Sequence, residues 1–158
     1  MALIKNKDIV AVFVGKGNEK EKLMNDANKQ GLNNVYFLDP VDKRMVPSLL
    51  KEMDVLYLGG KNQPLYQYGT SQTKLFDYMQ AAKPVIQTIS PPNNYVAEAQ
   101  CGITIVGDGA LAVANGIEKM MNYSKQELGE MGMRGKLYCN SHFNYRKLSF
   151  DFMKYINE

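Results

Sequence analysis

The sequence predicts an α/β protein in which a Rossmann-like parallel sheet is flanked by helices. Short apolar runs rich in β-branched and aromatic residues alternate with segments of helical periodicity, a rhythm typical of parallel strands joined by right-handed helical crossovers. The chain has 158 residues, 45% hydrophobic and 22% charged. These values fit one ordinary domain with a single core.

The elements follow in chain order. The run IVAVFVG, Ile9–Gly15, ends at a glycine and is typical of a strand buried on both faces. The helix after it, 19–32, has Gly31 as its expected C-cap, and a second helix has Pro47 near its first turn. Further strands are predicted at 35–38, 55–59, 84–88 and 102–106, and further helices at 43–53, from Ser71, at 94–100, and from Ala110 onward with breaks near Tyr123 and Asn140.

Composition narrows the function classes. The net charge of +3 is small and the basic residues are dispersed, which argues against a nucleic-acid partner. The cysteines, Cys101 and Cys139, form neither a metal-binding spacing nor a disulfide framework, so a reducing compartment is expected. The sequence shows no membrane-spanning run, no signal peptide and no His, Cys or acidic cluster at metal spacing.

The first strand-to-helix turn is a weak phosphate-site candidate. Gly15–Gly17 has Lys16 at its centre, but the third glycine of a dinucleotide fingerprint would fall on Lys20. Glu19 and Glu21 suit the start of a helix and would repel a phosphate. We therefore interpret the segment as a tight turn whose glycines can let the backbone approach a flat ligand such as a base.

The second turn carries the better anion signal. With Ser71 as N-cap, the first helical turn holds Gln72, Thr73 and Lys74, whose amides lack intrahelical partners. A lysine there opposes the helix dipole unless an anion binds. Asp77 shares a face with Thr73 and Lys74 and suits the two hydroxyls of a ribose. The alternative is an exposed Lys74–Asp77 pair worth about 0.3–0.5 kcal/mol.

The segment YGTSQTKLFDYMQAAKPVI, residues 68–86, resembles the donor-site segment of glycosyltransferase family 4, retaining enzymes of the GT-B fold. It is most similar to bacterial capsule and O-antigen transferases of the L-fucosamine type. FVGKGNEKEKL, NNVYFLDPV, VPSLLKEMDVLYL, NNYVAEAQCGITI and GDGALAVANGIEKMM match further family segments in order. The resemblance implies a nucleoside-diphosphate sugar (UDP- or GDP-sugar) as donor, a lipid-linked sugar as acceptor, and neither cofactor nor metal.

The resemblance also implies a site. The family's ribose-binding acid falls on Asp77, and its earlier acid falls on Gly69, which departs from the family pattern. The implied donor contacts are the amides of Gln72, Thr73 and Lys74 for phosphate, the turn Gly15, Lys16 and Gly17 with Phe37 and Leu38 for the base, and the backbone and hydroxyl groups of Gly69, Thr70 and Ser71. No catalytic residue is assigned.

In the family, an acceptor domain and a basic pair that grips the diphosphate lie before the segments matched here. We therefore expect residues 1–158 to be one donor-binding domain, a fragment lacking the first strand and helix and the N-terminal domain, and inactive alone. A bacterial protein in the cytoplasm or at the inner membrane face is implied. The C-terminal helix presents an apolar face, Phe143, Leu148, Phe152 and Tyr155, that favours a homodimer.

Three other classes of protein are alternatives to this interpretation. A dinucleotide-dependent Rossmann-like enzyme lacks its third glycine and an acid at the end of its second strand before Asp39. A receiver-type signalling domain lacks an acidic cluster after its first strand. A non-catalytic interaction module fits the composition and stays open.

Overall fold

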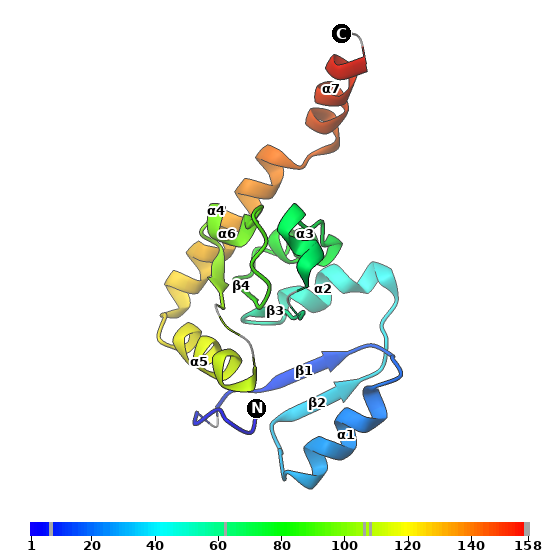
Figure 1. Cartoon of the computed structure of the whole chain (residues 1–158). Coiled ribbons are helices and arrows are strands. Elements are labelled where there is room, and N and C mark those ends of the chain that lie inside the picture. The colour runs from blue at the N-terminus through cyan, green and yellow to red at the C-terminus, as the bar shows by residue number, and fades with distance from the viewer. Residues whose placement is uncertain (7, 62, 106, 108, 157–158) are drawn as a thin grey trace.

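The computed structural model describes residues 1–6, 8–61, 63–105, 107 and 109–156. It confirms the α/β class, with parallel strands flanked by helices (Figure 1). The strands are β1 (Ala11–Val14), β2 (Val35–Leu38), β3 (Leu56–Leu58), β4 (Val85–Gln87) and β5 (Gly102–Thr104). Every described pairing between them is parallel.

The strands form two sheets rather than the single sheet that the sequence predicts. One has the order β1-β2 and the other β3-β4-β5. β4 has neighbours on both sides and is buried throughout, whereas Phe13 in β1 is 47% exposed. The prediction that β1 is buried on both faces is therefore wrong. The physical reason is that the Phe13 side chain stacks on its neighbour Phe37 and borders an open pocket, so this face of β1 is not fully covered.

Helices occupy the predicted intervals. They are α1 (Lys20–Lys29), α2 (Val46–Lys51), α3 (Thr73–Gln80), α4 (Tyr95–Glu98), α5 (Ala110–Met121), α6 (Lys125–His142) and α7 (Tyr145–Ile156), with short 3-10 turns at Lys43–Met45 and Pro64–Tyr68. Gly31 follows the C-cap of α1, Gln30, with a left-handed φ of 62°. The predicted C-cap is thus one residue late: Gln30 is the C-cap, and Gly31 fills the position after it, where L side chains are disfavoured.

Two predicted boundaries also shift. Gln72, in an extended conformation, is the N-cap of α3 in place of Ser71, and no side chain caps this helix end. The break predicted near Asn140 lies after His142, between α6 and α7. The break near Tyr123 is confirmed, and Ser124 there opens α6 with a reciprocal capping box.

The main core lies where α3 and α6 pack on the larger sheet. Met79 and Cys101 are fully buried there, and Val96 of α4 joins them. Helix α6 comes so close that a Cβ added at Gly132 would lie 2.0 Å from the Ala82 carbonyl oxygen. This close approach anchors α3 and the turn after it, and α3 carries the lysine and aspartate of the predicted anion site.

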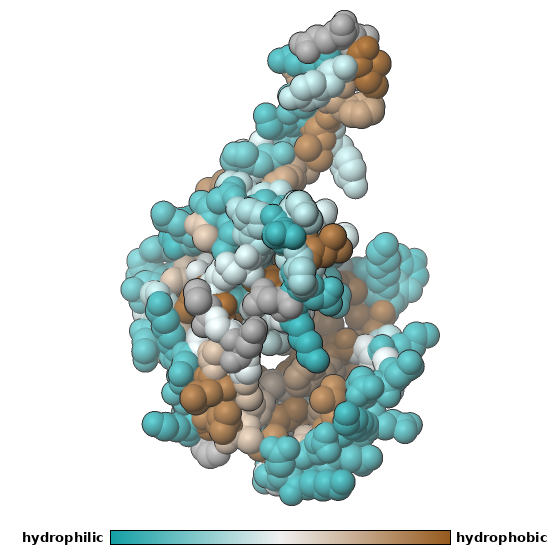
Figure 2. All heavy atoms as spheres, viewed as in Figure 1, coloured by the Kyte–Doolittle hydropathy of each residue, from teal (hydrophilic) through white to brown (hydrophobic). Residues whose placement is uncertain are grey.

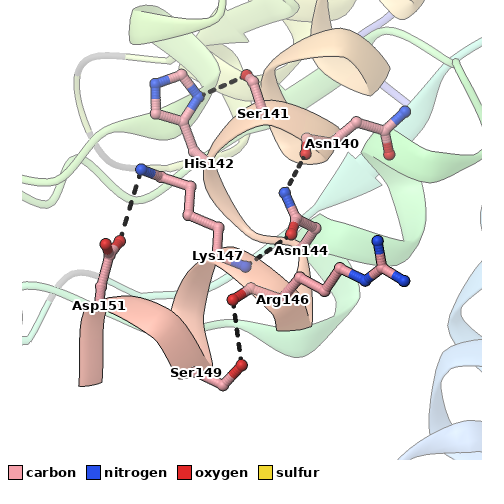
Figure 3. Close-up of polar contacts among 8 residues, drawn as sticks. All are labelled: Asn140, Ser141, His142, Asn144, Arg146, Lys147, Ser149 and Asp151. Carbon is pink, nitrogen blue, oxygen red and sulfur yellow. Dashed lines mark hydrogen bonds and ion pairs between the residues drawn. The ribbon is translucent and has the colours of Figure 1, made fainter. Parts of the chain in front are cut away.

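The last helix leaves this core. Asn144 donates through Nδ2 to the carbonyl of Asn140 at 2.7 Å, and its Oδ1 accepts from the amide of Lys147 at 2.9 Å (Figure 3). These bonds end one helix and begin the next. No described residue of α7 is buried, and the helix projects away from the sheets (Figure 1). Leu148, Phe152 and Tyr155 are 44%, 64% and 80% exposed, which confirms this part of the predicted apolar face. Phe143 is wrongly placed in that face, because it is the C-cap of α6 and packs against the main core, with its ring 4.8 Å from that of Phe76.

Candidate donor-binding site

The first predicted turn follows β1. Gly15 has a φ of 144° and donates its amide to the Leu38 carbonyl at 3.3 Å, which holds the ends of β1 and β2 together. The rings of Phe13 and Phe37 stack with centroids 5.2 Å apart. A shallow pocket of about 240 Å³ lies here, lined by Phe13, Val14, Gly15, Lys16, Gly17, Glu19, Lys20, Leu23 and Phe37. The turn thus offers a flat aromatic wall beside exposed glycine backbone, which suits a planar ring.

Lys20 crosses from α1 to the end of β2. Its Nζ donates to the Leu38 carbonyl at 2.9 Å and pairs with Asp39 at 3.0 Å. Glu19 and Glu21 stand at the start of the same helix. The nearby acids and the engaged lysine agree with the interpretation that this turn is not a phosphate site.

The second turn opens α3. Its first turn contains no acidic residue, and Lys74 lies within it. Lys74 and Asp77 form no ion pair with each other among the residues that the structure describes. The alternative of an exposed Lys74–Asp77 pair is therefore wrong for this structure. The exposed ammonium group and the uncapped amides of this helix end are open to an anion.

Gly15 and the α3 residues border one groove. It has a volume of about 510 Å³, and its lining includes Gly15, Lys74, Asp77 and Tyr78. Burial, and then the negative charge of Asp77, raises the pKa of the Tyr78 phenol. The Asp77 carboxylate and the Lys74 ammonium group therefore border the same groove as Gly15, although α3 and the first glycine turn lie about sixty residues apart in the sequence.

Gly69, Thr70 and Ser71 lie in a separate and more open pocket of about 810 Å³. Asn93 holds this loop: its Oδ1 accepts from the amide of Thr70 at 2.8 Å and its Nδ2 donates to the Thr70 carbonyl at 2.7 Å. A Cβ added at Gly69, where φ is 97°, would lie 3.0 Å from Asn93 Oδ1. The glycine at this departure from the family pattern thus allows the close contact with Asn93.

Asn93 is a site residue that the sequence reasoning missed. It belongs to the polar turn Pro-Pro-Asn-Asn before α4, whose second asparagine caps that helix through the amide of Ala97. The residue types signalled a turn and a cap. These residue types do not indicate that Asn93 bonds to Thr70, 23 residues away in the sequence.

Glu98 and Tyr95 also line the pocket around Gly69. The Tyr138 hydroxyl, on α6, donates to the Glu98 carboxylate. Burial, then this hydrogen bond and the negative charge, raises the pKa of Tyr138 to about 12. The phenol therefore remains protonated at neutral pH and orients the carboxylate beside the pocket.

The predicted site residues thus fall into three neighbouring places. Gly15, Lys16, Gly17 and Phe37 share the first pocket, with Leu38 bonded to it through the backbone; Lys74 and Asp77 share the groove; and Gly69, Thr70 and Ser71 share the third pocket. Gln72 and Thr73 line none of these three pockets. Both nevertheless lie at the N-terminal end of α3, where their amides were expected.

The described ranges offer no cluster of metal ligands. Among their residues, no group of three or more His, Cys, Asp or Glu side chains could hold a metal ion. None of the helices in the described ranges is both long and apolar enough to cross a bilayer. Cys101 is fully buried, and burial raises the pKa of its thiol to about 11. It packs as a small apolar residue, as the sequence indicated.

The family model described as glycosyl transferases group 1 matches residues 1–123. The chain belongs to this family. The match makes a dinucleotide-dependent oxidoreductase or a receiver domain the wrong class, and the donor-site segment 68–86 lies within the matched residues. A search of curated proteins finds no match for the chain.

Solved structures show the same fold. The chain is similar to Anabaena Alr3699/HepE in complex with UDP, with UDP-glucose, and with UDP and glucose, with TM-scores of 0.77, 0.76 and 0.75. Each is 16% identical to it, and the match covers 99% of this chain and 42% of the other. The arrangement matches the C-terminal half of a GT-B glycosyltransferase. The chain spans less than half the length of these proteins.

Proposed function

We propose that the chain binds the nucleoside-diphosphate part of a sugar donor for a glycosyltransferase. One observation carries the proposal: the uncapped start of α3, with Lys74 against the helix dipole and Asp77 one turn later, opens onto the groove that Gly15 also borders. An anion at the helix start would relieve the unfavourable position of Lys74. A ribose beside Asp77 would offer it two hydroxyl donors.

The likeness to structures that hold UDP and UDP-glucose supports a uridine donor over a guanosine donor. In the proposed pose, the base lies against the glycine turn and Phe37, and the diphosphate lies at the amides of Gln72, Thr73 and Lys74. The sugar then extends toward Gly69 and Ser71, beside the Asn93 clamp. In this pose, one extended ligand occupies all three neighbouring pockets.

The wider assignment follows the family 4 resemblance. We propose a retaining transfer to a lipid-linked sugar in bacterial capsular or O-antigen synthesis, at the inner face of the cell membrane. Helix-end amides and cationic side chains stabilise the leaving diphosphate, without a metal ion. The acceptor domain and the diphosphate-gripping basic pair belong to chain outside residues 1–158, so the isolated chain binds the donor weakly and does not turn it over.

Titration by calorimetry or NMR tests the binding. UDP is expected to bind saturably, GDP more weakly, and NAD not at all. Asp77→Ala should abolish the heat of UDP binding. Asp54→Ala is the matched control, because it removes the same charge just before β3, at the opposite end of the strands. Preferential NAD binding, or equal loss in both variants, contradicts the proposal.

A second titration addresses the metal. UDP affinity is expected to be the same with EDTA as with added Mg²⁺, because the helix amides and Lys74 supply the positive potential. A large gain with Mg²⁺ would contradict the metal-independent pose. The homodimer is a separate expectation. If two copies associate through the apolar face of α7, the Phe152→Glu variant should be a monomer, and sedimentation of the parent chain and the variant measures this.

A further inference from the structure

The pocket beside Gly69 carries a single charged side chain. Among the residues that line it, only Glu98 is charged, and the others are tyrosines, a glycine, hydroxyl residues, a proline and Asn93. The face over α3 and α4 is mainly hydrophilic or of intermediate hydropathy, in contrast with the hydrophobic hollow below it (Figure 2). The pocket thus combines one negative charge with aromatic and small polar residues.

The carboxylate of Glu98 is oriented but not neutralised. The Tyr138 hydroxyl donates to its Oε2. A carboxylate has about four acceptor positions, so most of those on Glu98 are available to a ligand. Arg134, one turn before Tyr138 on α6, donates instead to the Gln100 carbonyl at 2.9 Å. Across the described part of the chain, no ion pair includes Glu98, so the pocket retains its negative charge.

The position of Tyr138 is fixed by packing. Its ring stacks on that of His142, with centroids 4.2 Å apart, and lies 6.0 Å from that of Phe143, which packs against the main core. Helix α6 is itself close to β5, since a Cβ added at Gly135 would lie 2.9 Å from the Cβ of Cys101. The hydroxyl that orients Glu98 therefore comes from a ring held within an aromatic cluster.

The other polar groups of the pocket leave less for a ligand. Asn93 bonds both backbone groups of Thr70, and its Nδ2 also donates to the Tyr95 hydroxyl at 3.0 Å. Because that hydroxyl accepts this bond, its own proton is available to a ligand. Glu98 is thus the charged acceptor of the pocket, and Tyr95 is a neutral donor beside it.

This pocket adjoins the start of α3. Ser71 lines it and directly precedes Gln72, the N-cap of the helix. In the proposed pose the diphosphate lies at the amides from Gln72 onward, so the sugar attached to it reaches this pocket. The helix start and Lys74 favour negative charge, whereas Glu98 opposes it. The diphosphate and the sugar therefore meet opposite electrostatic potentials.

We propose that Glu98 selects a donor sugar that carries hydroxyl groups and no carboxylate. This inference rests on the proposed donor function and adds the class of sugar to it. Glu98 accepts hydrogen bonds from sugar hydroxyls, and Tyr138 is the positioning residue that orients it. Such charge-assisted bonds are about twice as strong as neutral ones, so this contact adds affinity for a neutral sugar. A uronic acid would bring a second carboxylate into the pocket, and the two like charges repel.

Two donors that differ at one carbon test this selection. UDP-glucose and UDP-glucuronate share the base, the diphosphate and the sugar ring, and differ only in a hydroxymethyl or a carboxylate group. NMR titration of residues 1–158 should show UDP-glucose binding at least roughly tenfold more tightly, the order expected for two like charges in a surface pocket. Glu98→Gln should weaken UDP-glucose and strengthen UDP-glucuronate, so that the ratio of their affinities approaches one. Loss of folding cannot produce these opposite changes.

Two further variants separate the contact from general charge and from packing. Glu130→Gln is the matched control, because it makes the same change on the exposed side of α6, at a residue that lines none of the three pockets. Its affinity ratio should equal that of the parent chain. Tyr138→Phe keeps the ring in the aromatic cluster and removes only the hydroxyl, so the ratio should fall to an intermediate value. An unchanged ratio in Tyr138→Phe would refute the positioning role.

The titrations distinguish failure of this inference from failure of the proposed function. If UDP binds and Asp77→Ala abolishes its binding, the donor function stands. Equal affinity of the parent chain for the two donors, or an unchanged ratio in Glu98→Gln, then overturns the assignment of Glu98 alone. A ratio that falls equally in Glu130→Gln overturns it as well, because the selection would come from net charge. If UDP does not bind, both proposals are wrong.

Discussion

Two glycines of α6 predict opposite effects of the same substitution. Gly129 and Gly132 lie within one helix, one on its exposed side and the other buried. A Cβ added at Gly129 meets nothing within 4 Å, whereas one at Gly132 would lie 2.0 Å from the Ala82 carbonyl oxygen and 2.9 Å from the Lys83 nitrogen. The pair therefore separates helix propensity from packing.

The magnitudes follow from these contacts. Alanine in place of glycine in a helix interior stabilises by about 1 kcal/mol. We expect that full gain in Gly129→Ala. In Gly132→Ala the obstacle is backbone, which cannot rotate aside, so overpacking should cost about 3 kcal/mol, the upper end of the usual range. The net effect is destabilisation by about 2 kcal/mol, and the two variants should differ by about 3 kcal/mol.

Urea unfolding followed by circular dichroism measures both free energies of unfolding. The slopes should agree between variants, because the surface exposed on unfolding is unchanged. Equal stability of Gly132→Ala and Gly129→Ala would contradict the predicted overpacking, because it would mean that α6 does not approach Ala82 closely. A stabilised Gly132→Ala would do so more strongly.

Three further predictions concern single contacts. Asn93→Ala removes both bonds to the Thr70 backbone, so exchange of the Thr70 amide should accelerate roughly thirtyfold, at about 1 kcal/mol per bond; Asn93→Asp, which retains the acceptor, should accelerate it less. Cys101 should react with iodoacetamide in the folded chain at least on the order of a hundredfold more slowly than an ordinary thiol, because its pKa is raised to about 11; ordinary reactivity would contradict its burial. The backbone and then the side-chain hydrogen bond of Ser124 lower the pKa of Glu127, so the stabilisation is present above the unfolded pKa and is lost as pH falls through the folded one. The Ser124→Ala variant should have a lower free energy of unfolding than the parent chain, and this difference should become smaller on acidification. A difference that does not change with pH would contradict the contribution of the capping box.

The local sequence pattern predicted most of the helices and strands. The β-branched runs predicted the strands, and the glycine and proline positions predicted the turns, with boundaries wrong by up to three residues. The arrangement of the strands was harder to predict, because the run around Phe13 reads as a buried strand regardless of whether a neighbour is present to bury it. Strand pairing depends on what occupies the next position in the sheet, which the pattern of a single strand does not contain.

The same distinction applies to the candidate site, where some residues could be predicted from their own segment and others could not. Lys74 was recognised because it breaks a local rule at a helix start, and Asp77 because it lies one turn later on the same face. Asn93 was missed because its function in the structure is a contact with Thr70, and only the folded chain brings the two together. Long-range polar contacts leave no periodic signal, so sequence reasoning finds the residues that are unusual in their own segment and misses those that support them.

Helix α7 has a consequence for how the chain unfolds. It contains 12 residues, none of them buried, and its stabilising contacts include the Asn144 cap, a Lys147–Asp151 pair at 3.5 Å and Lys154 over the Phe150 ring at 5.2 Å. Helices of that length are marginal in water when nothing packs against them. The segment should therefore melt as a separate cooperative unit below the temperature at which the core unfolds. Its helicity then reports whether another surface covers it, and a thermal scan that treats the whole chain as two-state will average two distinct transitions.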